Sequence, residues 1–133
     1  MSSRLQYKTT LRIMAEKRAF GPGVAMVLQG IQTQGSLTGA AKQMHMSYSK
    51  AWTIVKEAER IWGFPLTQRQ AGGRQGGYSA LTPQAEYILS RYKRMEQAID
   101  AVAKEKFEAF FNEAELEKMR CMTHDTKSGK GDI

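Results

Sequence analysis

Two amphipathic segments separated by a very short break constrain the fold of this chain more than any other feature. The first, SLTGAAKQMHM at residues 36–46, begins with a serine suited to cap a helix and has apolar residues on one face. The second, SYSKAWTIVKEAERIWG at residues 47–63, repeats apolar residues at spacings of three and four and ends in glycine. Small side chains at Ala40 and Ala41 allow the two helix axes to approach closely. The pattern predicts a helix-turn-helix.

The residues next to this pair predict a preceding helix and a small β component. Residues 7–20 alternate close to period two, which indicates a strand or a hairpin. A helix follows the Gly-Pro-Gly at 21–23 and ends at Gly35, a residue suited to a left-handed cap. Residues 65–69 and 79–81 predict two short strands around a glycine-rich loop.

That loop, within RQAGGRQGGYSALT at residues 69–82, could be a phosphate-binding loop, a linker or the tip of a hairpin. A nucleotide-binding loop needs a lysine and a hydroxyl residue after its last glycine, whereas tyrosine and serine follow here, and GxGxxG is absent. A linker is disfavoured because Thr82-Pro83 starts a helix at once. We therefore predict a hairpin tip, with Arg69 and Arg74 directed toward phosphates.

The last predicted helix is long, extending from residue 83 to 111. Its apolar residues alternate steps of three and four, as in a heptad seam, which predicts dimerisation. The dimerisation residues expected from the seam are Ile88, Tyr92, Met95, Ile99, Val102 and Phe107. The residues from Thr123 onward lack an apolar face, and a disordered tail is expected over residues 119–133.

The net charge of +7 is distributed unevenly along the chain. Residues 1–82 carry 11 Lys and Arg against 3 Asp and Glu, a net charge of +8, whereas residues 83–133 carry 9 against 10. This asymmetry suggests that the first part meets a polyanion. Charge alone leaves a merely solvated basic surface equally open.

Several classes of function lack the residues that they need. Cys121 is the single cysteine, and Cys121 with His124 nearby and His45 elsewhere cannot complete a tetrahedral zinc site. No Ser-His-acid arrangement with a supporting motif is visible. The chain starts without the apolar segment of a signal peptide, and its longest apolar run, residues 24–28, is far below the roughly 20 residues of a membrane helix. We expect a cytoplasmic protein without enzymatic activity, cofactor, bound metal or membrane partner.

The second helix of the pair carries the polar groups that suit nucleic acid. Its outer side offers hydroxyl and ammonium groups of the kinds that bond base edges and phosphates: Ser47, Tyr48, Ser49, Lys50, Thr53 and Lys56. Any amphipathic helix has a polar side, but here it follows a short helix and precedes a glycine-tipped hairpin, the arrangement of a winged helix-turn-helix. Trp52 and Trp62 are assigned to packing beneath this helix.

The order of these elements resembles the N-terminal domain of the ModE family, the molybdate-responsive bacterial regulators. The motifs that carry the resemblance are MSYSKAW at 46–52, the paired glycines at 72–77 and Leu81-Thr82, and it covers about residues 5–110. It implies a LysR-type winged helix-turn-helix that dimerises through the long helix and binds a roughly palindromic double-stranded DNA operator. Full members of the family carry a C-terminal molybdate-binding region, for which 133 residues leave no room, so no molybdate sensor is evident.

The predicted fold class is mainly α with a small β component: a winged helix-turn-helix followed by a long C-terminal dimerisation helix. The expected domains are residues 1–82 for DNA binding, 83–118 for the dimerisation helix and 119–133 for the tail. The expected DNA contacts are Ser36, Thr38, Lys42, Ser47, Tyr48, Ser49, Lys50, Thr53, Lys56, Arg69, Arg74 and Gln75. Two other functions stay open: a small-oxyanion sensor or storage protein for molybdate or tungstate, and a protein-interaction module acting through the long helix.

Overall fold

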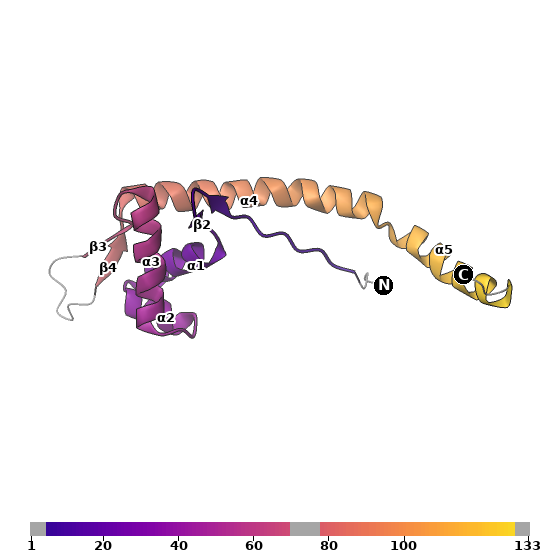
Figure 1. Cartoon of the computed structure of the whole chain (residues 1–133), viewed down its shortest axis with the longest axis horizontal. Coiled ribbons are helices and arrows are strands. Elements are labelled where there is room, and N and C mark those ends of the chain that lie inside the picture. The colour runs from indigo at the N-terminus through magenta and orange to yellow at the C-terminus, as the bar shows by residue number, and fades with distance from the viewer. Residues whose placement is uncertain (1–4, 70–77, 130–133) are drawn as a thin grey trace. The chain divides into compact units, whose positions relative to one another are not determined.

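The computed structural model describes residues 5–69 and 78–129, with side chains as far as residue 122 (Figure 1). Over these residues the chain forms two short hairpins and a series of helices, in the order β1-β2-α1-α2-α3-β3-β4-α4-α5. Their bounds are β1 Ile13–Met14, β2 Arg18–Phe20, α1 Pro22–Gln34, α2 Leu37–Gln43, α3 Tyr48–Trp62, β3 Thr67–Arg69, β4 Ser79–Leu81, α4 Pro83–Phe110 and α5 Glu113–Gly129. This confirms the predicted fold class: a helix-turn-helix with small β hairpins, followed by a long helix.

The chain divides into two compact units, residues 10–96 and residues 1–9 with 97–133. The domain boundaries predicted from the sequence, at residues 82 and 118, stay a prediction. No helix in the described ranges is both long enough and apolar enough to cross a membrane.

Local signals set the ends of the helices in residues 10–96. Helix α1 has Pro22 at its first position, where proline loses no helical hydrogen bond, and ends at Gly35 with φ of 78°. Helix α3 ends at Gly63 with φ of 87°. In this left-handed region the lack of a Cβ removes the steric cost that other residues carry. The predicted cap at Gly35 and the predicted end of the third helix at Gly63 are both confirmed.

Helices α1 and α2 approach each other at a glycine. A Cβ placed on Gly30 would lie 2.7 Å from the Ala40 Cβ and 3.0 Å from the Ala40 Cα. The small residue at position 40 predicted a close helix crossing. The prediction concerned the crossing of α2 with α3. The structure shows that Ala40 of α2 also lies close to Gly30 of α1.

The core of residues 10–96 lies between α1, α3, the β strands and the first turns of α4. Its largest fully buried aliphatic side chains are Leu28, Ile31, Leu66, Val27 and Val55. The ring of Tyr92 packs 4.8 Å from that of Phe20, and its hydroxyl donates a hydrogen bond to the Leu11 carbonyl at 2.7 Å. Burial raises the pKa of Tyr92, and the nearby Glu96 carboxylate raises it further.

The second unit contains an aromatic cluster beside the end of α4. The hydroxyl of Tyr7 donates to Asp100 Oδ1 at 2.7 Å, and its ring lies 5.1 Å from the ring of Phe107. Phe107 in turn lies 5.8 Å from Phe111. Donating this hydrogen bond to the Asp100 carboxylate stabilises the neutral phenol, so the pKa of Tyr7 is raised.

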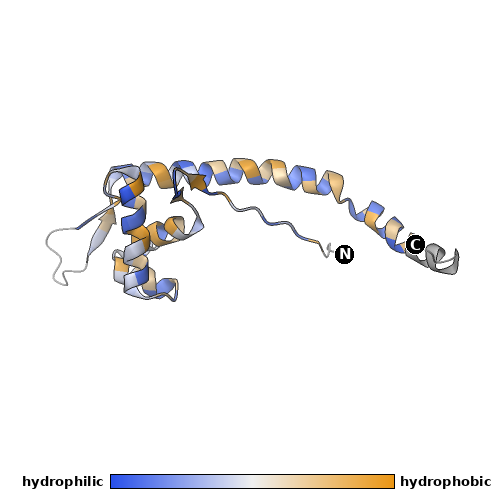
Figure 2. Ribbon diagram, in the orientation of Figure 1, coloured by the Kyte–Doolittle hydropathy of each residue, from blue (hydrophilic) through white to orange (hydrophobic). Residues whose placement is uncertain are grey.

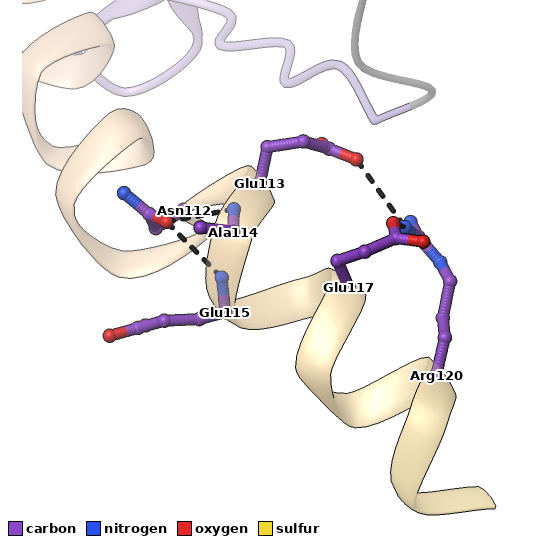
Figure 3. Close-up of polar contacts among 6 residues, drawn as sticks. All are labelled: Asn112, Glu113, Ala114, Glu115, Glu117 and Arg120. Atoms are coloured by element: carbon purple, nitrogen blue, oxygen red, sulfur yellow. Dashed lines mark hydrogen bonds and ion pairs between the residues drawn. The ribbon is translucent and has the colours of Figure 1, made fainter. Parts of the chain in front are cut away.

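Helix α5 is held by its own polar side chains (Figure 3). Asn112 Oδ1 accepts hydrogen bonds from the backbone N–H groups of Ala114 at 2.9 Å and Glu115 at 3.2 Å, which caps the helix. Arg120 pairs with Glu117 one turn away and with Glu113 at 3.4 Å. Regular helix therefore extends past residue 118, where the sequence pattern predicted no regular structure, because a polar helix can form through caps and local ion pairs without an apolar face.

Candidate nucleic-acid interface

The turn between α2 and α3 is closed by backbone hydrogen bonds and a left-handed residue. His45 has φ of 57°, the single positive φ among the described non-glycine residues. The backbone N–H of Met46 donates to the Ala41 carbonyl at 3.0 Å. Ser47 then caps α3, its Oγ accepting from the N–H of Lys50 at 3.1 Å. These contacts fix the direction in which α3 leaves the turn.

Helix α3 has one buried and one exposed side. Ala51, Val55 and Ala58 are buried against the core at spacings of four and three residues. The predicted DNA contacts of this region are all exposed: Ser47, Tyr48, Ser49, Lys50, Thr53 and Lys56. The first turns of α3 therefore offer hydroxyl and ammonium groups to a partner, and Ser47 combines exposure with its capping role.

Helix α2 contributes the predicted contacts Ser36, Thr38 and Lys42. Thr38 and Lys42 are exposed, whereas Ser36 is half-buried because its hydroxyl caps α2, accepting from the N–H of Gly39 at 2.9 Å. The predicted cap is confirmed. A role in DNA contact stays a prediction for all three residues.

Strands β3 and β4 form the base of the predicted wing. They pair antiparallel with Arg69 opposite Ser79, and Arg69 is exposed at the end of β3. The other two predicted wing contacts, Arg74 and Gln75, lie outside the described residues. The base of the hairpin is thus established as predicted, and its tip stays a prediction.

The base of the hairpin is attached to the turn between α1 and α2. The backbone N–H of Ser79 donates to the Gly35 carbonyl at 2.8 Å. The ring of Tyr78 lies against Gly35, with its Cε1 3.4 Å from where a Cβ would be, and half of the side chain stays exposed. Tyr78 therefore packs beside the helix-turn-helix while keeping an exposed edge.

Glu59 joins α3 to the hairpin from the other side. Its Oε2 accepts hydrogen bonds from the backbone N–H groups of Leu66 at 2.7 Å and Thr67 at 3.4 Å. Its Oε1 forms an ion pair with Lys56 Nζ at 3.2 Å. Sequence reasoning missed Glu59 because a glutamate three residues from a lysine is typical of any solvated helix face. Its role depends on the chain returning to it at β3.

Both tryptophans were predicted to pack beneath α3, and one of them does. Trp62 is half-buried and donates its indole N–H to the Ala19 carbonyl at 2.7 Å, so it packs beneath α3 as expected. Trp52 was predicted to pack there too, but 47% of it is exposed. The prediction for Trp52 is wrong: the side of α3 that is buried against the core consists of Ala51, Val55 and Ala58. The Lys56 ammonium lies 5.6 Å from the centre of the Trp52 ring.

The predicted dimerisation stripe on α4 falls into two parts. Ile88 and Tyr92 are buried in the core of their own chain, so their assignment to a dimer seam is corrected. Met95, Ile99 and Val102 are exposed, and Phe107 is half-buried by its aromatic neighbours. Figure 2 shows apolar residues recurring along α4 between hydrophilic ones. The exposed part of the stripe stays a predicted interface.

Comparisons with known proteins agree with this architecture. Residues 26–86 match the family of bacterial regulatory helix-turn-helix proteins of the lysR type. The helix-turn-helix part of the chain is therefore similar to the bacterial regulatory proteins of the LysR type. Within that class, the similarity is to ModE-type regulators, at 27–38% identity over the N-terminal portion of this chain.

Three relatives illustrate the similarity. The transcriptional regulator ModE of Haemophilus influenzae is 38% identical over 76 residues, which are 57% of this chain and 30% of the relative. The molybdenum transport protein ModE of Azotobacter vinelandii is 37% identical over 70 residues, 53% of this chain and 26% of the relative. The DNA-binding transcriptional dual regulator ModE of Escherichia coli K12 is 27% identical over 94 residues, which are 70% of this chain and 36% of the relative. The chain thus spans about a third of the length of the curated relatives that it matches.

Proposed function

We propose that this protein is a sequence-specific double-stranded DNA-binding transcription regulator. It acts as a homodimer, with α3 in the major groove and the β3-β4 wing at the backbone or in the minor groove. The observation that carries the proposal is the exposed polar surface on the first turns of α3, within a helix-turn-helix of a regulatory family. In this class of motif, the N-terminal part of the second helix contacts base edges. The name of the Escherichia coli relative also describes a DNA-binding regulator.

The electrostatics of α2 and α3 favour a polyanionic partner. Lys42 and Lys50 are exposed, and among the described residues no carboxylate lies within ion-pair distance of either. Their ammonium groups are therefore available to phosphates without first breaking an ion pair. Binding that neutralises phosphates releases counterions and weakens as the salt concentration rises.

Dimerisation through α4 would supply two reading helices for two half-sites. Met95, Ile99 and Val102 are exposed apolar residues at spacings of four and three, as on the contact face of a pair of helices. Burying them against a second copy removes apolar surface from water. Two copies related by a two-fold axis suit a roughly palindromic operator.

Selection of bound duplexes from a random-sequence pool tests DNA binding and identifies the target sequence in one experiment. Anisotropy titrations with the selected duplex then compare Lys50→Ala with Lys118→Ala, an exposed lysine of α5 whose loss changes the net charge equally. We expect Lys50→Ala to weaken binding about tenfold or more, and to reduce the salt slope by about 0.9 if Lys50 meets a phosphate. Equal effects of the two substitutions, or selection without any shared sequence, would refute the proposal.

Light scattering tests the dimer. The wild-type protein should have twice the chain mass of 15.0 kDa at micromolar concentration. Val102→Glu should convert it to a monomer because the substitution places a charge in the apolar contact. Met26→Glu, at another exposed apolar residue, should leave the mass unchanged. A wild-type monomer would contradict the proposed interface.

We keep as a second candidate function a small-oxyanion sensor or storage protein for molybdate or tungstate, since the name of the Azotobacter vinelandii relative refers to molybdenum transport. Calorimetric titration of the full chain with molybdate in the absence of DNA tests it. Heat with micromolar affinity would support this candidate, and no heat would end it. Either outcome is independent of the DNA selection.

A further inference from the structure

The exposed indole of Trp52 is an unusual feature of the polar side of α3. Trp52 is 47% exposed and Tyr48, one turn earlier, is 53% exposed. Large aromatic side chains gain most when they are buried, so an exposed pair on one helix side suggests a partner surface. The rest of that side is made of hydroxyl and ammonium groups.

A chain of contacts links the Trp52 ring to the base of the wing. The Lys56 ammonium lies over the ring at 5.6 Å and also pairs with Glu59 at 3.2 Å. Glu59 is in turn held by the backbone N–H of Leu66 at 2.7 Å, and Leu66 is fully buried. The ring therefore adjoins a cation that is anchored to the core through Glu59, which restricts its orientation before any partner binds.

We propose that Trp52 is a specificity-determining residue that contacts the 5-methyl group of thymine. The inference rests on the proposed function, because it requires α3 to enter the major groove. Base edges in that groove present hydrogen-bond donors and acceptors and a single kind of apolar group, the thymine methyl. The apolar face of an indole on α3 can discriminate between bases through that group.

The size of the expected effect follows from the burial of one methyl group. Burying a group of this size is worth about 0.8 kcal/mol, which corresponds to about a fourfold change in affinity for each methyl group contacted. Replacing thymine by uracil removes the methyl group and keeps the hydrogen-bonding edge. The loss of affinity for the uracil duplex therefore reports the apolar contact.

The test uses the full chain and a duplex selected from a random-sequence pool by the wild-type protein, made once with thymine and once with uracil. Wild type should bind the uracil duplex at least about fourfold more weakly. Trp52→Ala should bind both duplexes equally. Trp52→Phe should keep a preference for thymine, because it retains an apolar aromatic ring. Using the same two duplexes for every variant cancels any effect of uracil on DNA shape.

Three results would overturn the inference. If the wild-type protein binds both duplexes equally, it makes no contact with a thymine methyl group. This result does not depend on whether any variant folds. A thymine preference that persists in Trp52→Ala and disappears in Tyr48→Ala assigns the contact to the other exposed aromatic residue. Failure to select any duplex would remove the proposed function and this inference together, whereas tight binding without a thymine preference removes the inference alone.

Discussion

The crossing of α1 and α2 makes a quantitative prediction for Gly30→Ala. The new methyl group would lie 2.7 Å from the Ala40 Cβ and 3.0 Å from the Ala40 Cα, well inside van der Waals contact. No rotation of a side chain relieves these contacts, so α2 must shift away from α1. Overpacking of this kind costs about 1–3 kcal/mol, while alanine gains about 1 kcal/mol over glycine in a helix. We expect a net destabilisation of up to about 2 kcal/mol.

Gly23→Ala provides the matched control in the same helix. A Cβ at Gly23 meets no heavy atom within 4 Å, so this substitution should stabilise the protein by up to about 1 kcal/mol. Urea unfolding followed by tryptophan fluorescence measures both, since Trp52 and Trp62 lie in the unit formed by residues 10–96. Gly30→Ala that raises the midpoint as much as Gly23→Ala does would refute the close crossing of α1 and α2.

Substitutions at three further positions test other contacts of the fold. Thr82 is buried, and its Oγ1 accepts a hydrogen bond from the N–H of Ala85 at 3.1 Å. Thr82→Ala should therefore lower the free energy of unfolding by about 1–2 kcal/mol. Thr82→Ser keeps the hydroxyl and should recover most of this loss in the same urea titration. Glu59→Ala leaves the buried N–H of Leu66 without its acceptor and should cost about 1–3 kcal/mol, whereas Glu59→Gln retains an acceptor oxygen; equal losses would contradict the hydrogen bond. The raised pKa of Tyr92 means that the folded state holds the phenol proton more tightly than the unfolded state, so its stabilisation is complete below the ordinary tyrosine value of about 10 and decreases above it. Alkaline unfolding should therefore be less pH-dependent in Tyr92→Phe, and an unchanged pH profile would contradict this assignment.

The sequence predicted the helix ends because these depend on local signals. Two glycines end helices in the left-handed conformation, Gly35 and Gly63. Three hydroxyl side chains accept a hydrogen bond from the backbone N–H three residues further on: Ser36, Ser47 and Thr82. Such caps act through the backbone conformation and the hydrogen-bonding capacity of one side chain. They do not depend on the tertiary fold, so they can be identified from the sequence.

The apolar stripe of α4 shows what periodicity leaves undecided. Ile88 and Tyr92 are buried within the chain, whereas Met95, Ile99 and Val102 continue at the same spacings and are exposed. A repeat of three and four residues indicates that one side of a helix is covered. It does not distinguish a core within the chain from an interface with another copy.

The other missed residues depend on contacts that are distant in sequence. Gly30 is identified by its approach to Ala40 in the next helix, and Glu59 by the return of the chain at Leu66. The spacing of apolar residues in α3 predicted that Trp52 is packed, yet 47% of it is exposed. In each case the position depends on how the helices pack, which the pattern of one helix does not contain.

The central claim is that the first turns of α3 read DNA, and nuclear magnetic resonance tests it most directly. Backbone amide shifts of the isotope-labelled full chain are measured while a selected duplex is added. The largest changes should fall in residues 47–56, with smaller changes at Thr38 and Lys42 and little change in α5. Changes concentrated in α5 or around the aromatic cluster at Tyr7, with residues 47–56 unaffected, would contradict the claim.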